Sequence, residues 1–227
     1  MKTPCLLALT FASAAALAGP TNPFTETFDN GANNWLGGDF LPPAEHANGG
    51  VGDTGYISSQ TGFEFNDPGS FNTVFRGNKG LLPGTDASGG AFVGDWIAAG
   101  VTNLSFSLRH DIPEPVTVFV RIAADTFGAP FPGAVGIFFV PVFAGEWTDL
   151  SIDINPANPQ FVTYEDSSFE TVFSNVGFIQ IGIASPDGLL GDPTLYNVDL
   201  DNVAIVPAPA GLLAFAPVLA AATRRRR

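Results

Sequence analysis

The chain has 227 residues, of which 45% are hydrophobic and only 14% are charged, and it contains 26 glycines and 19 prolines. This Gly and Pro content disfavours a helical protein, while 21 phenylalanines supply enough apolar surface to exclude a disordered one. All 22 acids lie between Glu26 and Asp201, where there are four bases, so this body carries a net charge of −18. A surface this negative repels phosphate groups, which excludes nucleic acid as a partner.

The first 18 residues have the layout of a secretory signal peptide. Lys2 precedes an apolar run from Leu6 to Leu17, and Ala16-Leu17-Ala18 is a small-x-small cleavage site. We therefore expect signal peptidase as a partner and a mature chain that begins at Gly19. The one cysteine, Cys5, lies in the segment removed, so neither disulfides nor thiol chemistry is expected in the mature protein.

Residues 19–206 form one domain in which apolar and polar residues alternate with the period of β-strands and no convincing helix occurs. Turn residues separate the alternating segments, which favours an all-β, antiparallel β-sandwich of the jelly-roll type. About 185 residues are enough for such a domain to fold without disulfides. The predicted strands cover residues 103–109, 116–122, 147–154, 176–183 and 195–206, with weaker signals at 56–59 and 91–96.

Three stretches of the body resemble a known class of domain. The first is Glu26-Thr27-Phe28-Asp29-Asn30-Gly31 with Trp35, the second covers residues 145–153 around Trp147, and the third covers residues 198–203. Together they are similar to the first, middle and closing strands of galactose-binding-like and carbohydrate-binding-module jelly rolls. The resemblance implies the sandwich fold and a sugar ligand.

The same resemblance implies one structural calcium ion. In such jelly rolls the ion joins the first and last strands, which here would place Glu26 or Asp29 near Asp201, with backbone carbonyls completing the shell. Hard oxygen ligands suit Ca²⁺, whereas two histidines are few for a zinc site. The alternative is that these acids are solvated residues at the edge of an acidic protein.

A ligand surface is predicted from the polar faces of three strands. If Leu104, Phe106 and Leu108 face the core, together with Val118, Val120 and Ile122, the opposite faces combine aromatic rings with hydrogen-bonding groups. Two arginines on such a face suit an acidic polysaccharide or a carboxylate. The alternative is that Phe119 and Phe178 are covered by a loop or a second sheet. If the strands are neighbours, the predicted platform consists of Arg109, Phe119, Arg121, Phe178 and Gln180.

Catalytic signatures are not found, so we expect a protein that is not an enzyme. Gly52-Asp53-Thr54-Gly55 contains the Asp-Thr-Gly of aspartic proteases, but no second copy exists and a turn explains it better. There is no Gly-x-Ser-x-Gly elbow, and His46 and His110 are the only histidines.

The C-terminal segment, residues 207–227, has the layout of a sorting signal. Residues 204–222 lack polar side chains, a length close to the ~20 residues that cross a bilayer. Pro207-Ala208-Pro209, then an apolar run, then Arg224, Arg225, Arg226 and Arg227 resemble a PEP-CTERM signal. The family usually has Glu where this chain has Ala208. The resemblance implies a substrate of an exosortase-type enzyme in Gram-negative bacteria; the alternative is an ordinary single-span anchor.

These features predict an exported, non-catalytic protein of the cell surface or exopolysaccharide matrix, which contacts the membrane only through its C-terminal segment and binds carbohydrate. One alternative is a structural or adhesive matrix protein without a small ligand. The other is a divergent glycan-active hydrolase, which would need two acids about 5–10 Å apart in a cleft.

Overall fold

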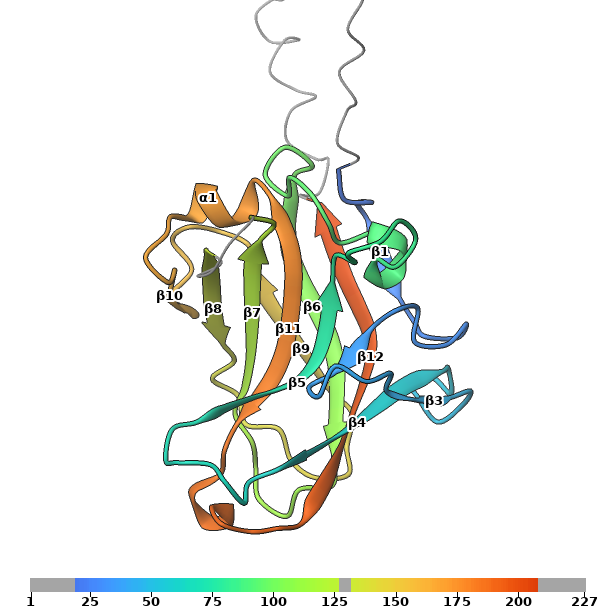
Figure 1. Ribbon diagram of the computed structural model, residues 1–227, viewed down its shortest axis with the longest axis vertical. Helices are drawn as coiled ribbons and strands as arrows, with labels where there is room; N and C mark the ends of the chain where they lie inside the picture. Colours follow the sequence, from blue (N-terminus) through green and yellow to red (C-terminus); the bar gives the residue numbers. More distant parts are fainter. Residues whose placement is uncertain (1–18, 127–131, 208–227) are drawn as a thin grey trace, which may run out of the picture.

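The computed structural model describes residues 19–126 and 132–207, which form two antiparallel sheets packed face to face (Figure 1). The predicted all-β sandwich is thereby confirmed. The predicted signal peptide, residues 1–18, and all but Pro207 of the predicted sorting segment, residues 207–227, lie outside the described residues. No helix among the described residues is long and apolar enough to span a bilayer.

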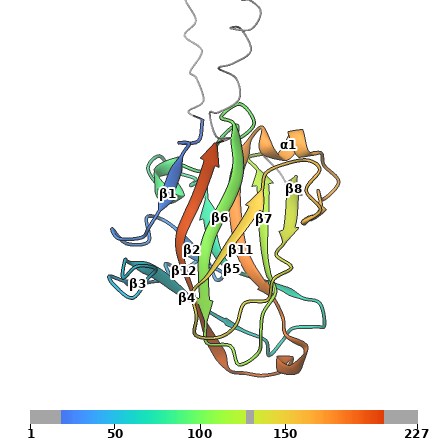
Figure 2. The same cartoon turned by 180° about the vertical axis from the view of Figure 1, so that it is seen from behind.

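Each sheet contains six strands, and Figure 2 shows them from behind. Sheet A has the order β3 (Ala44–His46), β4 (Tyr56–Gly62), β12 (Leu195–Pro207), β6 (Val101–His110) and β9 (Thr148–Asp153), and β1 (Phe24–Glu26) also pairs with β12. Sheet B has the order β10 (Phe161–Thr163), β8 (Gly133–Ile137), β7 (Val118–Ala124), β11 (Val176–Ala184), β5 (Phe71–Asn78) and β2 (Leu36–Gly37). The helical elements are short: α1 (Phe169–Phe173), η1 (Ala87–Gly90) and η2 (Asp187–Leu189).

The core lies between the sheets and uses the faces that the alternation predicts. On β6 the inward residues Leu104, Phe106 and Leu108 are buried, and on β7 Val118, Val120 and Ile122 are buried. Burial of each such side chain contributes about 1.5–3 kcal/mol, so the facing of these strands is strongly determined. Trp35, which follows the first strand, is also buried and packs edge-on against Phe28 and Phe92.

Two expectations about local structure are wrong. Residues 91–96 form no strand; Gly94 has a φ of +121° and makes an isolated bridge with Val176, and the buried Trp96 ring donates to the carbonyl of Phe92. The expected absence of helix fails at α1, where the Ser168 hydroxyl caps a single turn by accepting the Thr171 N–H. One short turn escapes detection because helical periodicity needs a longer segment.

Both ends of the described chain lie at the same end of the sandwich, as Figure 1 shows. The pairing of β1 with β12 explains this, because Phe24 lies opposite Ile205 near the end of the chain. The loops that follow β6 and β11 lie at the far end.

Candidate functional site

The structure brings four of the five predicted ligand residues onto one sheet and separates the fifth. Gln180 of β11 lies opposite Arg121 of β7, and Phe119 and Phe178 lie on the same two strands. Arg109 lies on β6, in the other sheet. The single platform predicted from the sequence is therefore corrected: consecutive strands β6 and β7 belong to different layers, so Arg109 points away from the other four residues.

A row of polar residues crosses the outer face of sheet B. Arg76 of β5 lies opposite Gln180, which lies opposite Arg121, so an amide separates two guanidinium groups. Directly opposed side chains have Cβ atoms about 4.5–5.5 Å apart, so these three groups form one surface. Arg76 was not among the predicted residues, because a register shift in the pairing with β11 leaves Val74 and Phe75 both buried and interrupts the alternation of β5.

Arg76 differs from the other bases of the body in its surroundings. Its guanidinium lies 4.1 Å from the centroid of the exposed Phe40 ring and donates to the carbonyl of Gly38. Burial, followed by the charge of Arg121, lowers the pKa of Arg76. Among the described residues the ion pairs are Lys79–Asp125, Arg109–Asp199 and Arg121–Glu165, so Arg76 contacts no carboxylate there.

The aromatic residues of this face have different roles. Phe178 is half-buried and lines a hollow of about 460 Å³ together with Phe40 and the exposed Leu81 and Leu82. Phe119, in contrast, is 4% exposed, and its ring packs edge-on against Phe71. Phe119 was expected to stack on a ligand, but its packing leaves it no surface for that role. The aromatic contribution to this face therefore comes from Phe40 and Phe178.

The acid Asp201 is a fully buried residue of β12 and serves as a hydrogen-bond acceptor. Its Oδ2 accepts the Val51 N–H at 2.8 Å and the Thr54 hydroxyl at 3.0 Å, and its Oδ1 accepts the Asn202 N–H at 2.6 Å. Burial raises the pKa of Asp201. No base of the described residues forms an ion pair with it. Burying an ionised carboxylate without a positive partner costs free energy, and a bound cation would lower that cost.

Glu26 lies on β1, which pairs with the strand of Asp201, and Asp29 contacts the same loop as Asp201 does. Glu26 is buried beside β12, opposite Val203, and its Oε1 accepts the Phe28 N–H and the Asn33 side-chain amide. Asp29 is exposed; the Gly55 N–H, which it accepts at 2.9 Å, lowers its pKa. The alternative of solvated edge residues is thus wrong for the two buried acids.

The oxygen atoms around Gly50 test whether calcium suits this place. A Cβ added to Gly50 would lie 2.6 Å from Asp201 Oδ2, 2.6 Å from the Gly55 carbonyl and 2.8 Å from the Thr54 carbonyl, so these oxygens already contact the Gly50 backbone and leave no room for an ion at that point. The Thr54 carbonyl also accepts the Gly50 N–H at 2.9 Å. No three His, Cys, Asp or Glu side chains of residues 19–126 and 132–207 gather closely enough to hold a metal. An ion near Asp201 would therefore depend on this carboxylate and on backbone carbonyls.

No protein-family model matches the sequence. No curated protein matches it either. Among solved structures, an exo-β-agarase is similar with a TM-score of 0.51 and 10% identity, over 83% of this chain and 26% of that chain.

Two xylan-related structures are also similar. The CBM22-1 xylan-binding domain of Paenibacillus barcinonensis Xyn10C has a TM-score of 0.49 and 11% identity, over 85% of this chain and 99% of that domain. The CBM22-1 and GH10 modules of Clostridium thermocellum endo-1,4-β-D-xylanase 10B have a TM-score of 0.45 and 16% identity, over 82% of this chain and 28% of that chain. At such identities the likeness is one of fold, and the chain spans only about a quarter of the agarase.

Proposed function

We propose that this protein is an exported, non-catalytic β-sandwich that binds an acidic polysaccharide at the cell surface or in the extracellular matrix. The binding surface is the outer face of sheet B. The observation that carries the proposal is Arg76, a half-buried guanidinium that stacks on Phe40 and contacts no carboxylate of the described residues.

The distribution of charge supports an acidic ligand. The body holds four bases against 22 acids, yet Arg76 and Arg121 lie two strands apart on one face. Two guanidinium groups in an acidic protein repel each other less when a ligand carboxylate lies near them. The planar fork of Arg76 matches a carboxylate with two parallel hydrogen bonds.

The neighbouring side chains suit the rest of a sugar. The Gln180 amide can both donate to and accept from hydroxyl groups. The rings of Phe40 and Phe178 flank the row and offer apolar surface to the C–H face of a pyranose. A polyuronate, with one carboxylate on each sugar, combines all three kinds of group. The fold shared with part of an agarase does not decide the ligand, so the proposal rests on this face.

Polygalacturonate and its methyl-esterified form test the proposal, because they share a backbone and differ in charge. We expect binding to the acid form only, weakened roughly tenfold or more by Arg76→Ala and less by Arg76→Lys. Arg109→Gln, which removes the same charge from a base of sheet A that is already paired with Asp199, is the control and is expected to change affinity little. Equal binding of both polymers, or an Arg76→Ala variant that binds like the wild type, contradicts the proposal.

Export and sorting form a separate part of the proposal. Signal peptidase would cleave before Gly19, and an exosortase-type enzyme would process the tail near Pro207, Ala208 and Pro209. Protein recovered from the cell surface is then expected to begin at Gly19 and to lack Arg224–Arg227. Intact mass and N-terminal sequencing decide this; surface protein that retains both ends contradicts it.

We also propose one structural calcium ion at Asp201. The ion would supply the positive charge that this buried carboxylate lacks, with backbone carbonyls completing its shell. Its role would be to hold the loop after β3 against the last strand.

A further inference from the structure

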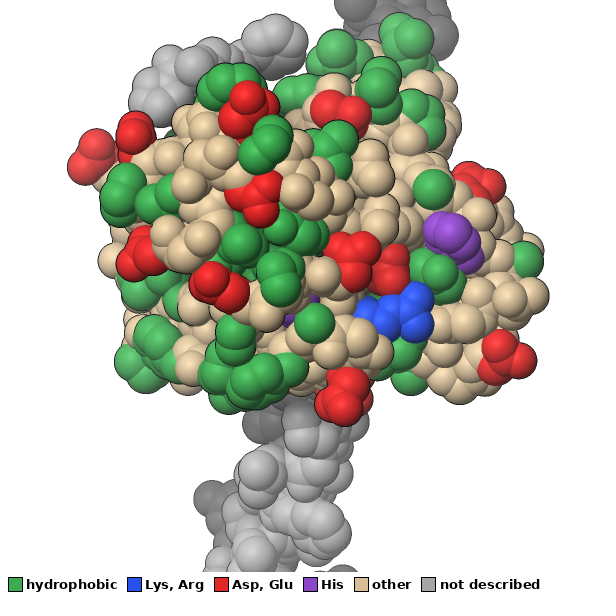
Figure 3. Space-filling view, turned by 90° about the horizontal axis from the view of Figure 1, so that it is seen from below, with side chains coloured by type: hydrophobic (Ala, Val, Ile, Leu, Met, Phe, Trp, Pro, Cys, Tyr) green, Lys and Arg blue, Asp and Glu red, His purple; other side chains and the backbone are tan. Residues whose placement is uncertain are grey.

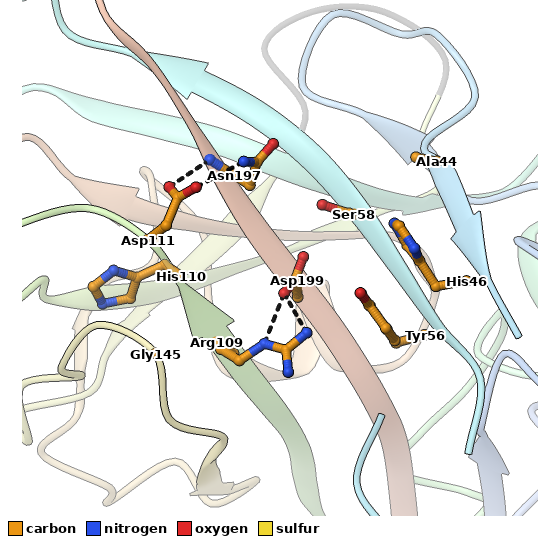
Figure 4. Close-up of a pocket in the computed structure, with 10 residues that line it drawn as sticks. All are labelled: Ala44, His46, Tyr56, Ser58, Arg109, His110, Asp111, Gly145, Asn197 and Asp199. Carbon is orange, nitrogen blue, oxygen red and sulfur yellow. Dashed lines mark hydrogen bonds and ion pairs between the residues drawn. The ribbon is translucent and has the colours of Figure 1, made fainter. Parts of the chain in front are cut away.

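A second hollow lies on the opposite sheet, where β3, β4, β12 and β6 run side by side (Figure 4). Its volume is about 550 Å³. Figure 3 views the molecule from the end opposite the chain termini. It shows a basic side chain next to acidic ones, with a histidine close by. Sheet A faces away from sheet B, so this hollow is separate from the polysaccharide face proposed above.

Small side chains open the hollow in the middle of a cross-strand row. Ala44 lies opposite Ser58, Ser58 opposite Asp199, and Asp199 opposite Arg109. Ala44 and Ser58 leave space above the sheet, while the longer Asp199 and Arg109 bound it on one side. The floor of the hollow is therefore a polar stretch of β-sheet.

Arg109 forms one wall of the hollow, where its side chain is held in place and its charge is neutralised by an ion pair. Its Nε and Nη2 atoms each lie 2.8 Å from Asp199 Oδ2. Its guanidinium carbon lies 4.5 Å from the centroid of the Trp147 ring and 5.0 Å from that of Tyr56. An ion pair packed against two aromatic rings is well ordered, but it is already neutral.

Two further pairs of side chains close the hollow. The exposed His46 ring stacks on Tyr56 with centroids 4.3 Å apart and planes 6° apart. On the other side, Asp111 accepts the backbone N–H of Asn197 at 2.8 Å and its side-chain amide at 2.7 Å. Both walls are thus fixed before any ligand arrives, which reduces the entropy that binding costs.

Polar groups without a partner line the space between these walls. No hydrogen bond joins the Tyr56 hydroxyl, the Ser58 hydroxyl or Asp199 Oδ1 to another described residue, although Arg109, Asp111 and Asn197 are all engaged. Two hydroxyls and a carboxylate oxygen can exchange hydrogen bonds with a polyol. The lining holds one arginine against two aspartates, so an anion is disfavoured.

We propose that this hollow binds an uncharged sugar residue of a neutral glycan. This hollow would therefore prefer a neutral ligand, whereas the outer face of sheet B would prefer an acidic one. The two sheets of a sandwich pack about 10 Å apart with their outer faces turned away from each other, so both sites can be occupied at once. One domain would then bridge an acidic chain and a neutral chain; this bridging, though not the hollow itself, rests on the proposed function of sheet B.

The two histidines make the site directly observable. His46 and His110 both line the hollow, neither lies on sheet B, and the sequence contains no other histidine. We expect millimolar cellohexaose, xylohexaose or agarohexaose to shift their ring signals in NMR spectra of the full domain. No shift with any of the three contradicts the proposal.

A double variant tests the residues. Tyr56→Phe with Ser58→Ala removes two hydroxyls but keeps the ring stack and the ion pair, and it should weaken hexasaccharide binding roughly tenfold or more. Ser105→Ala, which removes a hydroxyl from β6 away from the hollow, is the control for a generally altered sheet. Unchanged binding by the double variant overturns the proposal.

Separate variants test the acidic-polysaccharide site on sheet B and the neutral-glycan site on sheet A. Arg76→Ala acts on polygalacturonate, whereas the double variant acts on the neutral hexasaccharide. For bridging, wild-type protein on immobilised polygalacturonate should capture the neutral polymer whose hexasaccharide binds, and either variant should abolish capture. Capture that survives both changes, or its absence when both sites bind their separate probes, contradicts the bridge.

Discussion

Val51 and Asp201 are 150 residues apart in the chain, yet the Val51 amide donates a 2.8 Å hydrogen bond to Asp201 Oδ2. This bond ties the loop after β3 to the last strand. The same loop carries Gly49, whose carbonyl accepts from Arg109 and from the Trp147 ring. One buried carboxylate therefore supports both the proposed calcium position and the rim of the hollow on sheet A.

Asp201→Ala should destabilise the domain by about 2–4 kcal/mol, because it leaves the partly buried N–H groups of Val51 and Asn202 without their acceptor. Urea denaturation measures this as a lower midpoint with an unchanged slope. Asp29→Ala, at an exposed carboxylate of the same cluster, is the comparison and should cost less. If the two substitutions lower the free energy of unfolding equally, burial does not explain the contribution of Asp201 to stability.

Calcium should raise the melting temperature relative to chelator at matched ionic strength. An ion at a hundredfold excess over its Kd adds about 2.7 kcal/mol, which corresponds to several degrees at roughly 2–4 °C per kcal/mol. Asp201→Asn should remove most of this difference, since it removes the anionic ligand while keeping a similar shape. Identical melting curves of the wild type in calcium and in chelator would refute the calcium site.

Stability should fall as the pH is lowered from about 7 towards the folded-state pKa of His110. The ring is buried, its Nδ1 accepts the Ile112 N–H, and its Nε2 donates to the Val142 carbonyl. Burial lowers the pKa of His110 below its ordinary 6.5, despite the opposing charge of Asp111. The unfolded chain therefore binds a proton first, and the stability present above pH 6.5 is lost on acidification.

Urea midpoints between pH 8 and pH 5 measure this effect. His110→Gln should flatten the profile over that range. Asp201, whose pKa burial raises, acts with the opposite sign, because its contribution is lost as the pH rises through its folded-state pKa. An unaltered profile in His110→Gln would assign the pH dependence to other groups.

Gly182→Ala should cost about 3 kcal/mol, because an added Cβ would meet Phe119 Cε1 at 2.5 Å and collide with the Asn72 backbone. Gly191→Ala is the matched control. Its φ of +82° strains any side chain by roughly 1–2 kcal/mol, but no atom lies within 4 Å of the new Cβ. Thermal unfolding compares the two, and a Gly182→Ala variant as stable as Gly191→Ala would mean that Phe119 is not tightly packed.

The sequence by itself determined the strands with clear alternation, such as β6 and β7, and which of their faces are buried, but it did not predict β2, β3, β5, β8 or β10. On β6 and β7 every second residue is apolar, and a shift of one position would expose the whole apolar set to water, so the pattern allows one facing. The segment 91–96 misled because it combines apolar residues with a glycine of positive φ, and apolar runs alone do not separate a strand from a buried turn.

Only the tertiary structure decided which strands are neighbours. Alternation reports that Arg109 and Arg121 both point outward, but not that their consecutive strands belong to different sheets. The row of Arg76, Gln180 and Arg121 joins three strands that are not consecutive in the chain, and the stack of His46 on Tyr56 begins in a three-residue edge strand. Strand facing depends on neighbouring residues along the chain, whereas strand pairing depends on how distant apolar faces pack, and that packing places the side chains of both proposed sites.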